Sequence, residues 1–316
     1  MRYFDLHCDT VTECYLKNCG LADNGLHISL KGAQAYETWV QFFAVWIPDN
    51  IRGKAAWERF CGCCELLKYE TTLNGVSLCG NTAELESAVA AGSKRAAILS
   101  IEGSAALDGN LDNLAKAYGM GVRMITLTWN GACEAGGGCL DGDGLSPFGT
   151  RLVVEMQRLG VVVDVSHLSD RGFYDVANAT EAPFVASHSN SRSVCKNKRN
   201  LTDEQFLEIV RRGGIVGLNL YPAFLGGRSL SSVCRHVDRF LSLGGENTIA
   251  VGADFDGAAM PDGVSGIADM AKLYEILRES YGESTVEKIF FGNAYNFYKT
   301  VLTGCDCCNN ILSDHA

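Results

Sequence analysis

The sequence lacks several features, and each absence excludes a class of protein. No stretch of the 316 residues approaches the roughly 18 consecutive apolar residues that a membrane-spanning helix requires. Basic residues are fewer than acidic ones, 27 against 37, and the net charge of −10 argues against a surface for nucleic acids or anionic membranes. Charged Asp5 lies where a signal peptide would be apolar. We therefore expect a cytoplasmic protein.

Cysteine, by contrast, is abundant, with 14 residues. A secreted disulfide scaffold is usually much shorter, and in a reducing compartment these side chains act as small apolar groups. Residues 61–64 and 305–308 each contain the C-x-x-C spacing that can build a zinc site. The two clusters lie far apart, and the first falls in a helical pattern. We interpret them as free thiols, with a structural metal as the alternative.

Short apolar runs rich in β-branched residues predict eight buried strands, at 3–9, 40–47, 95–103, 122–130, 161–167, 184–189, 215–220 and 249–257. Helical patterns alternate with them. Strands that are apolar on both faces and alternate with helices predict an α/β fold, a TIM-like (β/α)8 barrel. A doubly wound open sheet is the alternative, but no Gly-rich phosphate turn follows an early strand. We assign residues 1–303 to this single barrel and residues 304–316 to a Cys-rich C-terminal tail.

Metal-type ligands recur where these predicted strands end: His7 and Asp9, Glu102, His167, His188, and Asp254 with Asp256 two residues on. Residues two apart share a strand face, so His7 and Asp9 should point into the barrel and Cys8 out of it. In a barrel all strand ends of one sense meet at one rim, where active sites form. We expect the remaining histidines on the surface: His27, His236 and His315.

The convergence of these side chains predicts bound metal at that rim, because buried carboxylates and imidazoles are costly without a cation. Three imidazoles and two carboxylates suit zinc best, although manganese or iron can use the same donors. Five ligands exceed the needs of one tetrahedral zinc, and two metals sharing a carboxylate fit better. Asp9, Glu102, a bridging hydroxide and nearby Asp254 bring the charge of two dications close to neutral.

Four sequence blocks resemble the membrane (renal) dipeptidases, zinc metallopeptidases with a metal-dependent amidohydrolase barrel. The most specific block is IEGSAALDGNLDNLAKAYGMGVR, which carries Glu102-Gly103, Leu114, Tyr118 and Gly121-Val122-Arg123. The blocks SPFGTRLVVEMQRLGVVVDVSHLSD, SHSNSRSVCKNKRNLTDEQ and GADFDG follow in the family's order, so the resemblance covers nearly the whole chain. No apolar C-terminal tail of the GPI type is present, and the chain resembles the soluble bacterial branch.

The resemblance implies a role for each matching residue. The implied zinc ligands are His7 and Asp9 for one ion, His167 and His188 for the second, and Glu102 as the bridge. Arg199 would receive the terminal carboxylate of a dipeptide, which suits its planar guanidinium. From the residues alone, a surface charge in the basic run 196–199 is the alternative. Asp254 would be the carboxylate that handles protons.

The chain departs from the family at the end of the fourth predicted strand. Many members have a histidine there that is thought to stabilise the tetrahedral intermediate, and this chain has Trp129. Trp129 has an indole N–H but no positive charge, and Asn130 beside it can donate instead. Alternatively, Trp129 only forms a wall of the pocket. Asn219 and Tyr221, after the seventh strand, are candidate substrate contacts, with loop packing as the alternative.

Together these observations predict a zinc-dependent dipeptidase. A hydroxide bridging two zinc ions would attack the peptide carbonyl, and Asp254 would take its proton and deliver it to the leaving amine. Two alternatives stay open: another hydrolase on the same metal site, such as a deacylase or lactonase, and a metal-binding barrel impaired in catalysis. No G-x-S-x-G motif supports a serine nucleophile. We expect a dipeptide substrate and neither nucleic acid nor membrane as a partner; homodimerisation stays open.

Overall fold

The computed structural model describes residues 1–90 and 94–302, so the Cys-rich tail predicted at 304–316, with its C-x-x-C and His315, lies outside the described residues. The strands are β1 (Arg2–Asp5), β2 (Thr38–Trp46), β3 (Ser77–Leu78), β4 (Arg95–Glu102), β5 (Val122–Thr126), β6 (Val162–Asp164), β7 (Val216–Leu218) and β8 (Ile249–Val251). The α-helices are α1 (Thr10–Lys17), α2 (Gly53–Leu73), α3 (Thr82–Ala90), α4 (Leu111–Gly119), α5 (Pro147–Leu159), α6 (Asp170–Ala179), α7 (Asp203–Arg211), α8 (Pro222–Leu225), α9 (Ser232–Ser242), α10 (Met270–Tyr281), α11 (Glu283–Glu287) and α12 (Asn293–Val301). In the part of the chain that is described, no helix combines the length and the apolarity needed to cross a bilayer.

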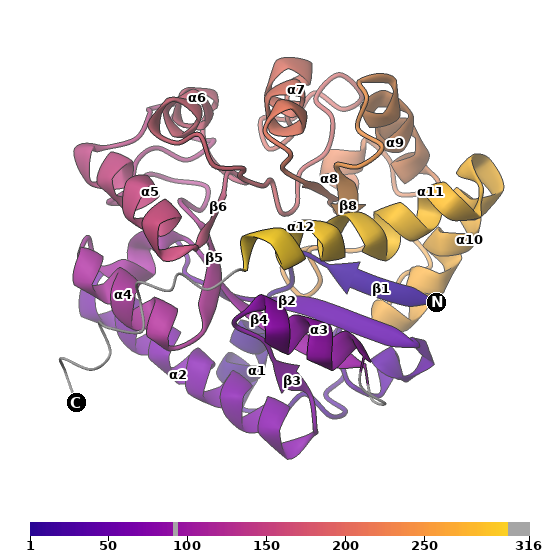
Figure 1. Cartoon of the computed structure of the whole chain (residues 1–316), viewed down its shortest axis with the longest axis horizontal. Coiled ribbons are helices and arrows are strands. Elements are labelled where there is room, and N and C mark those ends of the chain that lie inside the picture. Colours follow the sequence, from indigo (N-terminus) through magenta and orange to yellow (C-terminus); the bar gives the residue numbers. More distant parts are fainter. Residues whose placement is uncertain (91–93, 303–316) are drawn as a thin grey trace.

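The strands form one curled parallel sheet in the order β6-β5-β4-β2-β1-β8-β7, with the short β3 beside β4 (Figure 1). The interval between β6 and β7 is filled by residues 184–189, where isolated bridges link Asp164 to Val185 and Ala186 to Val216. Since β1 pairs with both β2 and β8, the hydrogen bonds run around a complete ring. The predicted TIM-like (β/α)8 barrel is confirmed.

One predicted strand, 184–189, is therefore only an extended segment with isolated bridges. The reason lies in its backbone, because side chains of the preceding segment take up its N–H groups. Ser187 N donates to Asp164 Oδ1 at 2.8 Å, and His188 N donates to Ser166 Oγ at 3.1 Å. These bonds replace ladder bonds to the carbonyls of a neighbouring strand, and they fix the segment without a regular ladder.

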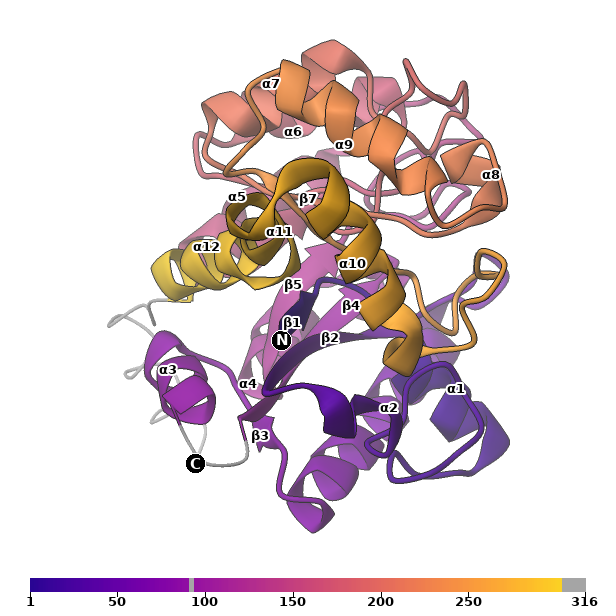
Figure 2. The same cartoon turned by 90° about the vertical axis from the view of Figure 1, so that its right-hand side faces the viewer.

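Helices cover the outside of the sheet, and α12 lies across one end of the barrel (Figures 1 and 2). The helices that follow the second half of the sheet begin at capping side chains. Ser146 and Ser169 accept bonds from the backbone N–H of the residue three positions on, and Thr202 forms a reciprocal capping box with Gln205. These caps stop each loop at a defined residue, so the strand-end loops have a fixed length.

Side chains alternate across β4 in the way that a barrel wall requires. Ala96 and Ile98 pack in an inner cluster, whereas Leu99 and Ile101 pack in the outer layer between sheet and helices. The inner cluster also holds residues of the other strands and of α12, among them Phe4, Val40, Phe42, Met124, Val162, Val185, Ala250, Phe297 and Tyr298. Glu102 shares the inner face with Ile98, so it lies above this inner cluster, at the carboxyl end of the barrel.

The predicted surface position of His236 is wrong. Its side chain on α9 is fully buried, and its ring connects two loops. Nδ1 accepts from Ser191 N at 3.1 Å, and Nε2–H donates to Leu225 O at 3.2 Å. Burial lowers the pKa of His236 to about 4, so the ring is neutral at pH 7 and serves as one acceptor and one donor. The helical pattern places the residue on α9 but does not reveal which loops cover it.

His27 is also constrained, although it is partly exposed. Its Nδ1 accepts from Asp256 N at 2.9 Å, and its own backbone N–H donates to Asp256 Oδ1 at 2.7 Å. The thiols at 61–64 lie on α2 and are free, as interpreted from the sequence. Burial raises the pKa of Cys63 to about 12, which keeps this thiol protonated and unreactive.

We expect His236→Ala to lower the free energy of unfolding by about 2–4 kcal/mol, because Ser191 N–H loses its acceptor in a buried place and Leu225 C=O keeps only its bond from Arg235. Urea denaturation measures the change. Ser242→Ala, at the exposed end of the same helix, is the control and should change stability by less than about 0.5 kcal/mol. Equal stability of the His236 variant and the wild type would contradict the connecting role of the ring.

Candidate metal centre

Six of the seven ligand-type residues predicted at strand ends lie together at the carboxyl rim of the barrel and are buried: His7, Asp9, Glu102, His167, His188 and Asp254. A cavity of about 500 Å³ opens above them. Its walls are formed by Asp9, Glu13, Trp46, Glu102, Trp129, Asn130, His167, Tyr221, Phe224, Asp254, Asp256, Gly257, Ala258 and Ala259. The structure thus brings the residues together as the barrel prediction requires.

Glu102 is the centre of the arrangement. Its Oε1 lies 2.7 Å from His167 Nε2 and 3.4 Å from His188 Nε2, and the two Nε2 atoms are 2.9 Å apart. Its other oxygen, Oε2, lies 3.5 Å from His7 Nε2. One carboxylate therefore contacts imidazoles that come from three separate segments of the barrel.

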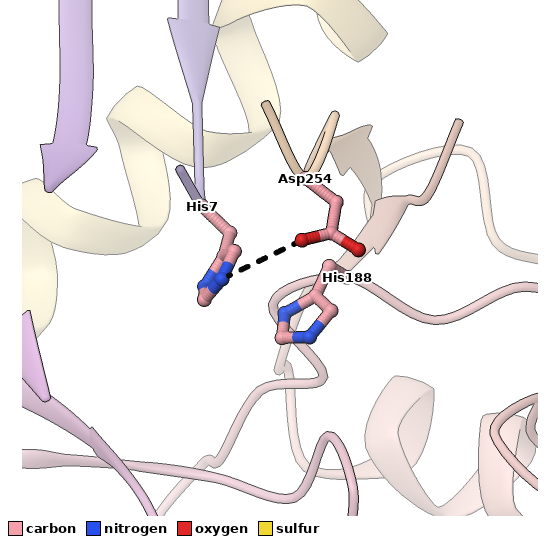
Figure 3. Close-up of side chains that lie close together, drawn as sticks. All are labelled: His7, His188 and Asp254. Atoms are coloured by element: carbon pink, nitrogen blue, oxygen red, sulfur yellow. Dashed lines mark ion pairs between the residues drawn. The ribbon is translucent and has the colours of Figure 1, made fainter. Parts of the chain in front are cut away.

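A second group forms around His7. Its Nε2 lies 3.8 Å from Asp9 Oδ1. It also lies 3.8 Å from Asp254 Oδ1, the ion pair drawn in Figure 3. Both ring nitrogens of His7 and the Oδ1 atom of Asp9 are buried and find no hydrogen-bond partner among the residues that the structure describes. Cys8, between these two residues, points away from the site, and its Sγ donates to Phe42 O at 3.3 Å. Buried polar atoms without partners are costly, and a cation among them would satisfy them.

Three overlapping sets of donor atoms have the spacing of a metal site: His7, Asp9 and Glu102; Glu102, His167 and His188; and His7, His188 and Asp254. The first two sets share Glu102. Imidazole and carboxylate donors within 4.8 Å of one another suit zinc and several other divalent metals. The residues present therefore fit a metal centre, and the shared carboxylate fits a centre for two ions.

The backbone is strained at two of these residues. His167 has φ of 68° and Asp254 has φ of 64°, left-handed values that cost energy for residues other than glycine. Gly257 lies so close to the carboxylates that a Cβ atom there would collide with Asp9 and would lie 2.5 Å from Asp254 Oδ1. This packing explains why the GADFDG block ends in glycine. Strained conformations concentrated at one rim are typical of functional sites.

Neighbouring side chains orient several of the ligand-type residues. Asn130 Oδ1 accepts from His167 Nδ1–H at 2.9 Å, so this amide oxygen is not free for substrate. Asn219 is fully buried and outside the cavity lining, and its Nδ2 donates to Asp254 Oδ2 at 3.0 Å. We read both asparagines as residues that position a ligand-type side chain. Asp256 binds Thr10 Oγ1 at 2.5 Å and anchors the same rim.

Burial and charge set the protonation of the site. Burial, and then the charge of Arg199, lower the pKa of His167 to about 3. Burial and the charge of His7 lower the pKa of His188 to about 4. For His7, burial acts in the same direction, but Glu102, Asp9 and Asp254 together raise its pKa to about 10. Two of the imidazoles are thus ready to bind a cation, whereas His7 must first lose a proton.

Aromatic side chains form the walls of the cavity. The rings of Trp46 and Trp129 meet edge to face, with centroids 5.1 Å apart, and the Trp129 ring lies 6.4 Å from that of His167. Tyr221 also lines the cavity, as its predicted role as a substrate contact requires. Trp46 and Phe224 also line the cavity and were not predicted from the sequence, because neither is a metal-type ligand nor part of a matching sequence block. Trp46 ends β2, so its position was a usable signal.

Arg199 is buried beside the site, but it does not belong to the cavity lining. Its Nη2 donates to His188 O at 3.4 Å, and the ring of Phe224 lies 5.3 Å from its guanidinium. Its Nε finds no partner among the described residues. No ion pair of Arg199 is found among the described residues. Burial lowers the pKa of Arg199, but an arginine keeps its charge. The result is a buried cation that no anion of residues 1–90 and 94–302 neutralises at contact distance.

The carboxyl rim of this parallel barrel carries a buried carboxylate that two imidazole–carboxylate groups share. This combination of fold and site defines a metal-dependent hydrolase. A model of the membrane dipeptidase family, peptidase family M19, matches residues 1–304. The chain belongs to this family, as the sequence blocks predicted.

Similar proteins agree with this assignment. Dipeptidase 3 of Rattus norvegicus is 28% identical over 310 residues, which cover 89% of this chain and 61% of that protein. An uncharacterized Klebsiella pneumoniae protein encoded in the pqqA 5′ region is 35% identical over 222 residues, or 65% of this chain and 82% of that protein. The crystal structure of a Rhodobacter sphaeroides metallopeptidase, liganded with a phosphinate mimic of the dipeptide L-Ala-D-Ala, superimposes with a TM-score of 0.88. It is 28% identical, and the match covers 96% of this chain and 98% of that one.

We expect zinc binding to the metal-free protein to release protons and to strengthen as the pH rises. With a pKa of about 10, His7 is protonated at pH 7, and a cation must displace that proton. The apparent affinity should therefore rise by up to about tenfold per pH unit between pH 6 and 9. Calorimetric titrations in buffers of different ionisation enthalpy count the protons. An affinity that is independent of pH would contradict this picture of His7.

Proposed function

We propose that the chain hydrolyses dipeptides with the help of two zinc ions. His7, Asp9 and Glu102 would hold one ion, and Glu102, His167 and His188 would hold the other. The observation that carries the proposal is the position of Glu102, whose Oε1 lies 2.7 Å from His167 Nε2 and whose Oε2 lies 3.5 Å from His7 Nε2. Membership in the dipeptidase family supports the substrate class.

When bound, the zinc ions would supply a water of lowered pKa and polarise the scissile carbonyl. The residues of the chain would do the rest. Asp254 lines the cavity, and the Asn219 amide holds its Oδ2 at 3.0 Å. With this orientation fixed, Asp254 would accept a proton from the attacking water and return it to the leaving amine. The left-handed backbone at Asp254 presents the carboxylate at the rim.

Arg199 would pair with the free carboxylate of the dipeptide. A buried guanidinium without an ion pair is costly, and a bound carboxylate would neutralise it with two parallel hydrogen bonds. The ring of Phe224 contacts the guanidinium and also lines the cavity, so Phe224 lies between Arg199 and the cavity. Such a pairing would place the second residue of the substrate near Phe224 and would select for a free C-terminus.

The aromatic walls would determine which side chains the cavity accepts. Trp129 occupies the position where many family members have a histidine. Its ring packs against Trp46 at the cavity wall. Its neighbour Asn130 uses its amide oxygen on His167, which leaves only the amide N–H group for substrate. We therefore assign Trp129 to the wall, where it would contact the apolar part of a dipeptide.

The proposal predicts turnover of dipeptides with free termini, and the panel should include L,L- and L,D-dipeptides beside N-acyl amino acids and lactones. The L,D pairs belong in it because the Rhodobacter sphaeroides metallopeptidase was crystallised with a mimic of L-Ala-D-Ala. Amidation of the C-terminus should lower kcat/KM strongly, since Arg199 would lose its anion. Hydrolysis of acyl amino acids or lactones without any dipeptide turnover would favour the deacylase or lactonase alternative.

Glu102→Ala should lower bound zinc and activity together, because both proposed ions lose a shared ligand. Elemental analysis of the purified variant gives the metal content per chain. Glu58→Ala, on the exposed side of α2, is the control and should keep the zinc content and the activity of the wild type. Full zinc content in the Glu102 variant would contradict the bridging role.

Asp254→Asn should lower kcat by about 100-fold or more, because an amide cannot carry the proton. Zinc content should stay unchanged, and KM should change by only about threefold or less, since the residue would act mainly in the transition state. Asp262→Asn, an exposed carboxylate paired with Arg228, is the control. A loss confined to KM, with kcat intact, would show that Asp254 binds substrate and does not transfer the proton.

A further inference from the structure

Two buried carboxylates below the rim have a common pattern that the proposed mechanism does not use. Asp5 accepts backbone N–H groups from His7 at 3.1 Å and from Ala253 at 3.0 Å. Asp164 accepts them from Ser166 at 3.0 Å and from Ser187 at 2.8 Å. Each carboxylate thus ties the end of its own strand to a neighbouring segment, directly before a ligand-type residue of that segment.

The two carboxylates differ in what their second oxygen contacts. Asp5 Oδ2 accepts from Tyr3 at 2.6 Å, which leads away from the site. Asp164 Oδ2 accepts from two hydroxyls, Thr126 Oγ1 and Ser187 Oγ, each at 2.6 Å. The Ser187 hydroxyl in turn lies 2.7 Å from His188 Nδ1. Only Asp164 is therefore connected through side chains to a predicted metal ligand.

The number of available protons determines the direction of this chain of hydrogen bonds. Burial opposes the ionisation of Asp164, but the four hydrogen bonds that it accepts favour its ionised form and hold its pKa low. An ionised carboxylate can only accept, so the single hydroxyl proton of Ser187 must point to Asp164. The Ser187 oxygen is then an acceptor, and His188 Nδ1 must carry the proton. The lone pair of His188 lies on Nε2, which faces Glu102 and His167.

We propose that Asp164 and Ser187 are positioning residues that hold His188 as the Nδ1–H tautomer and so present its Nε2 atom to a metal ion. The inference deepens the proposed metal centre and rests on it. His7 differs, because its Nδ1 has no partner within the described part of the chain and its tautomer is not fixed in this way. The group of Glu102, His167 and His188 is therefore preorganised, since Asn130 does for His167 what Ser187 does for His188.

The chain offers a matched pair of variants. Thr126→Val and Ser187→Ala each remove one hydroxyl that donates to Asp164 Oδ2 at 2.6 Å. Both side chains are buried, and both changes conserve most of the volume. Only Ser187→Ala also removes the acceptor of His188 Nδ1–H. A purely structural role of the Asp164 bonds would affect both variants alike, whereas the positioning role would affect one.

Zinc titration of the metal-free protein is the first test. We expect Ser187→Ala to lower the affinity for one of two zinc ions by about 10-fold to 100-fold. The affinity for the other ion should stay within about threefold of the wild-type value. Thr126→Val should keep both affinities within about threefold. Equal losses in the two variants, or no loss in Ser187→Ala, would overturn the proposal.

Nitrogen-15 NMR of the histidine rings in metal-free protein is the second test, and it requires neither metal nor turnover. The wild type and Thr126→Val should show His188 protonated at Nδ1 only, and Ser187→Ala should show a mixture of tautomers or the Nε2–H form. A wild-type His188 protonated at Nε2 would contradict the inference. If zinc does not bind the wild type at all, the proposed function fails, while the tautomer measurement still decides the role of Ser187.

Discussion

The structure depends on one electrostatic constraint, the convergence of electron-rich atoms on Glu102. A carboxylate oxygen and two imidazole nitrogens lie within 3.4 Å of one another, and a third imidazole faces the other carboxylate oxygen. Nδ1 of His167 faces Asn130 Oδ1 and Nδ1 of His188 faces Ser187 Oγ. With the protons on these Nδ1 atoms, as proposed for His188, the lone pairs of both rings face Glu102. Such an arrangement repels itself unless a cation lies within it, and the barrel is rigid enough to keep it assembled.

The barrel wall supplies that rigidity in layers. Cα register aligns Trp46, Glu102, Thr126 and Asp164 on four adjacent strands at the same height. In this layer, Trp46 lines the cavity and Glu102 is the central carboxylate. Thr126 donates to Asp164, which in turn holds the segment of His188. Below it lies the apolar inner cluster that α12 closes. The site is therefore supported by strand register, and not by loops alone.

The ligand-bearing ends are not regular strands, and this has a physical cause. Asp5 and Asp164 take backbone N–H groups that would otherwise continue the ladder, which ends β1 and β6 early and leaves 184–189 as isolated bridges. Strand ends freed in this way can adopt the left-handed backbone of His167 and Asp254. The same carboxylates that shorten the sheet thereby place the functional side chains.

The sequence by itself determined the fold class and the six ligand-type residues, because apolar periodicity and strand-end polarity are local signals, and a barrel brings every strand end of one sense to the same rim. It did not determine which polar residues are buried. His236 was expected on the surface and connects two loops, and Asn219 and Asn130 form hydrogen bonds with Asp254 and His167. Only the tertiary structure decided these roles, together with the link from Asp164 through Ser187 to His188, because a hydrogen-bond partner is set by the segment that packs opposite and not by spacing along the chain.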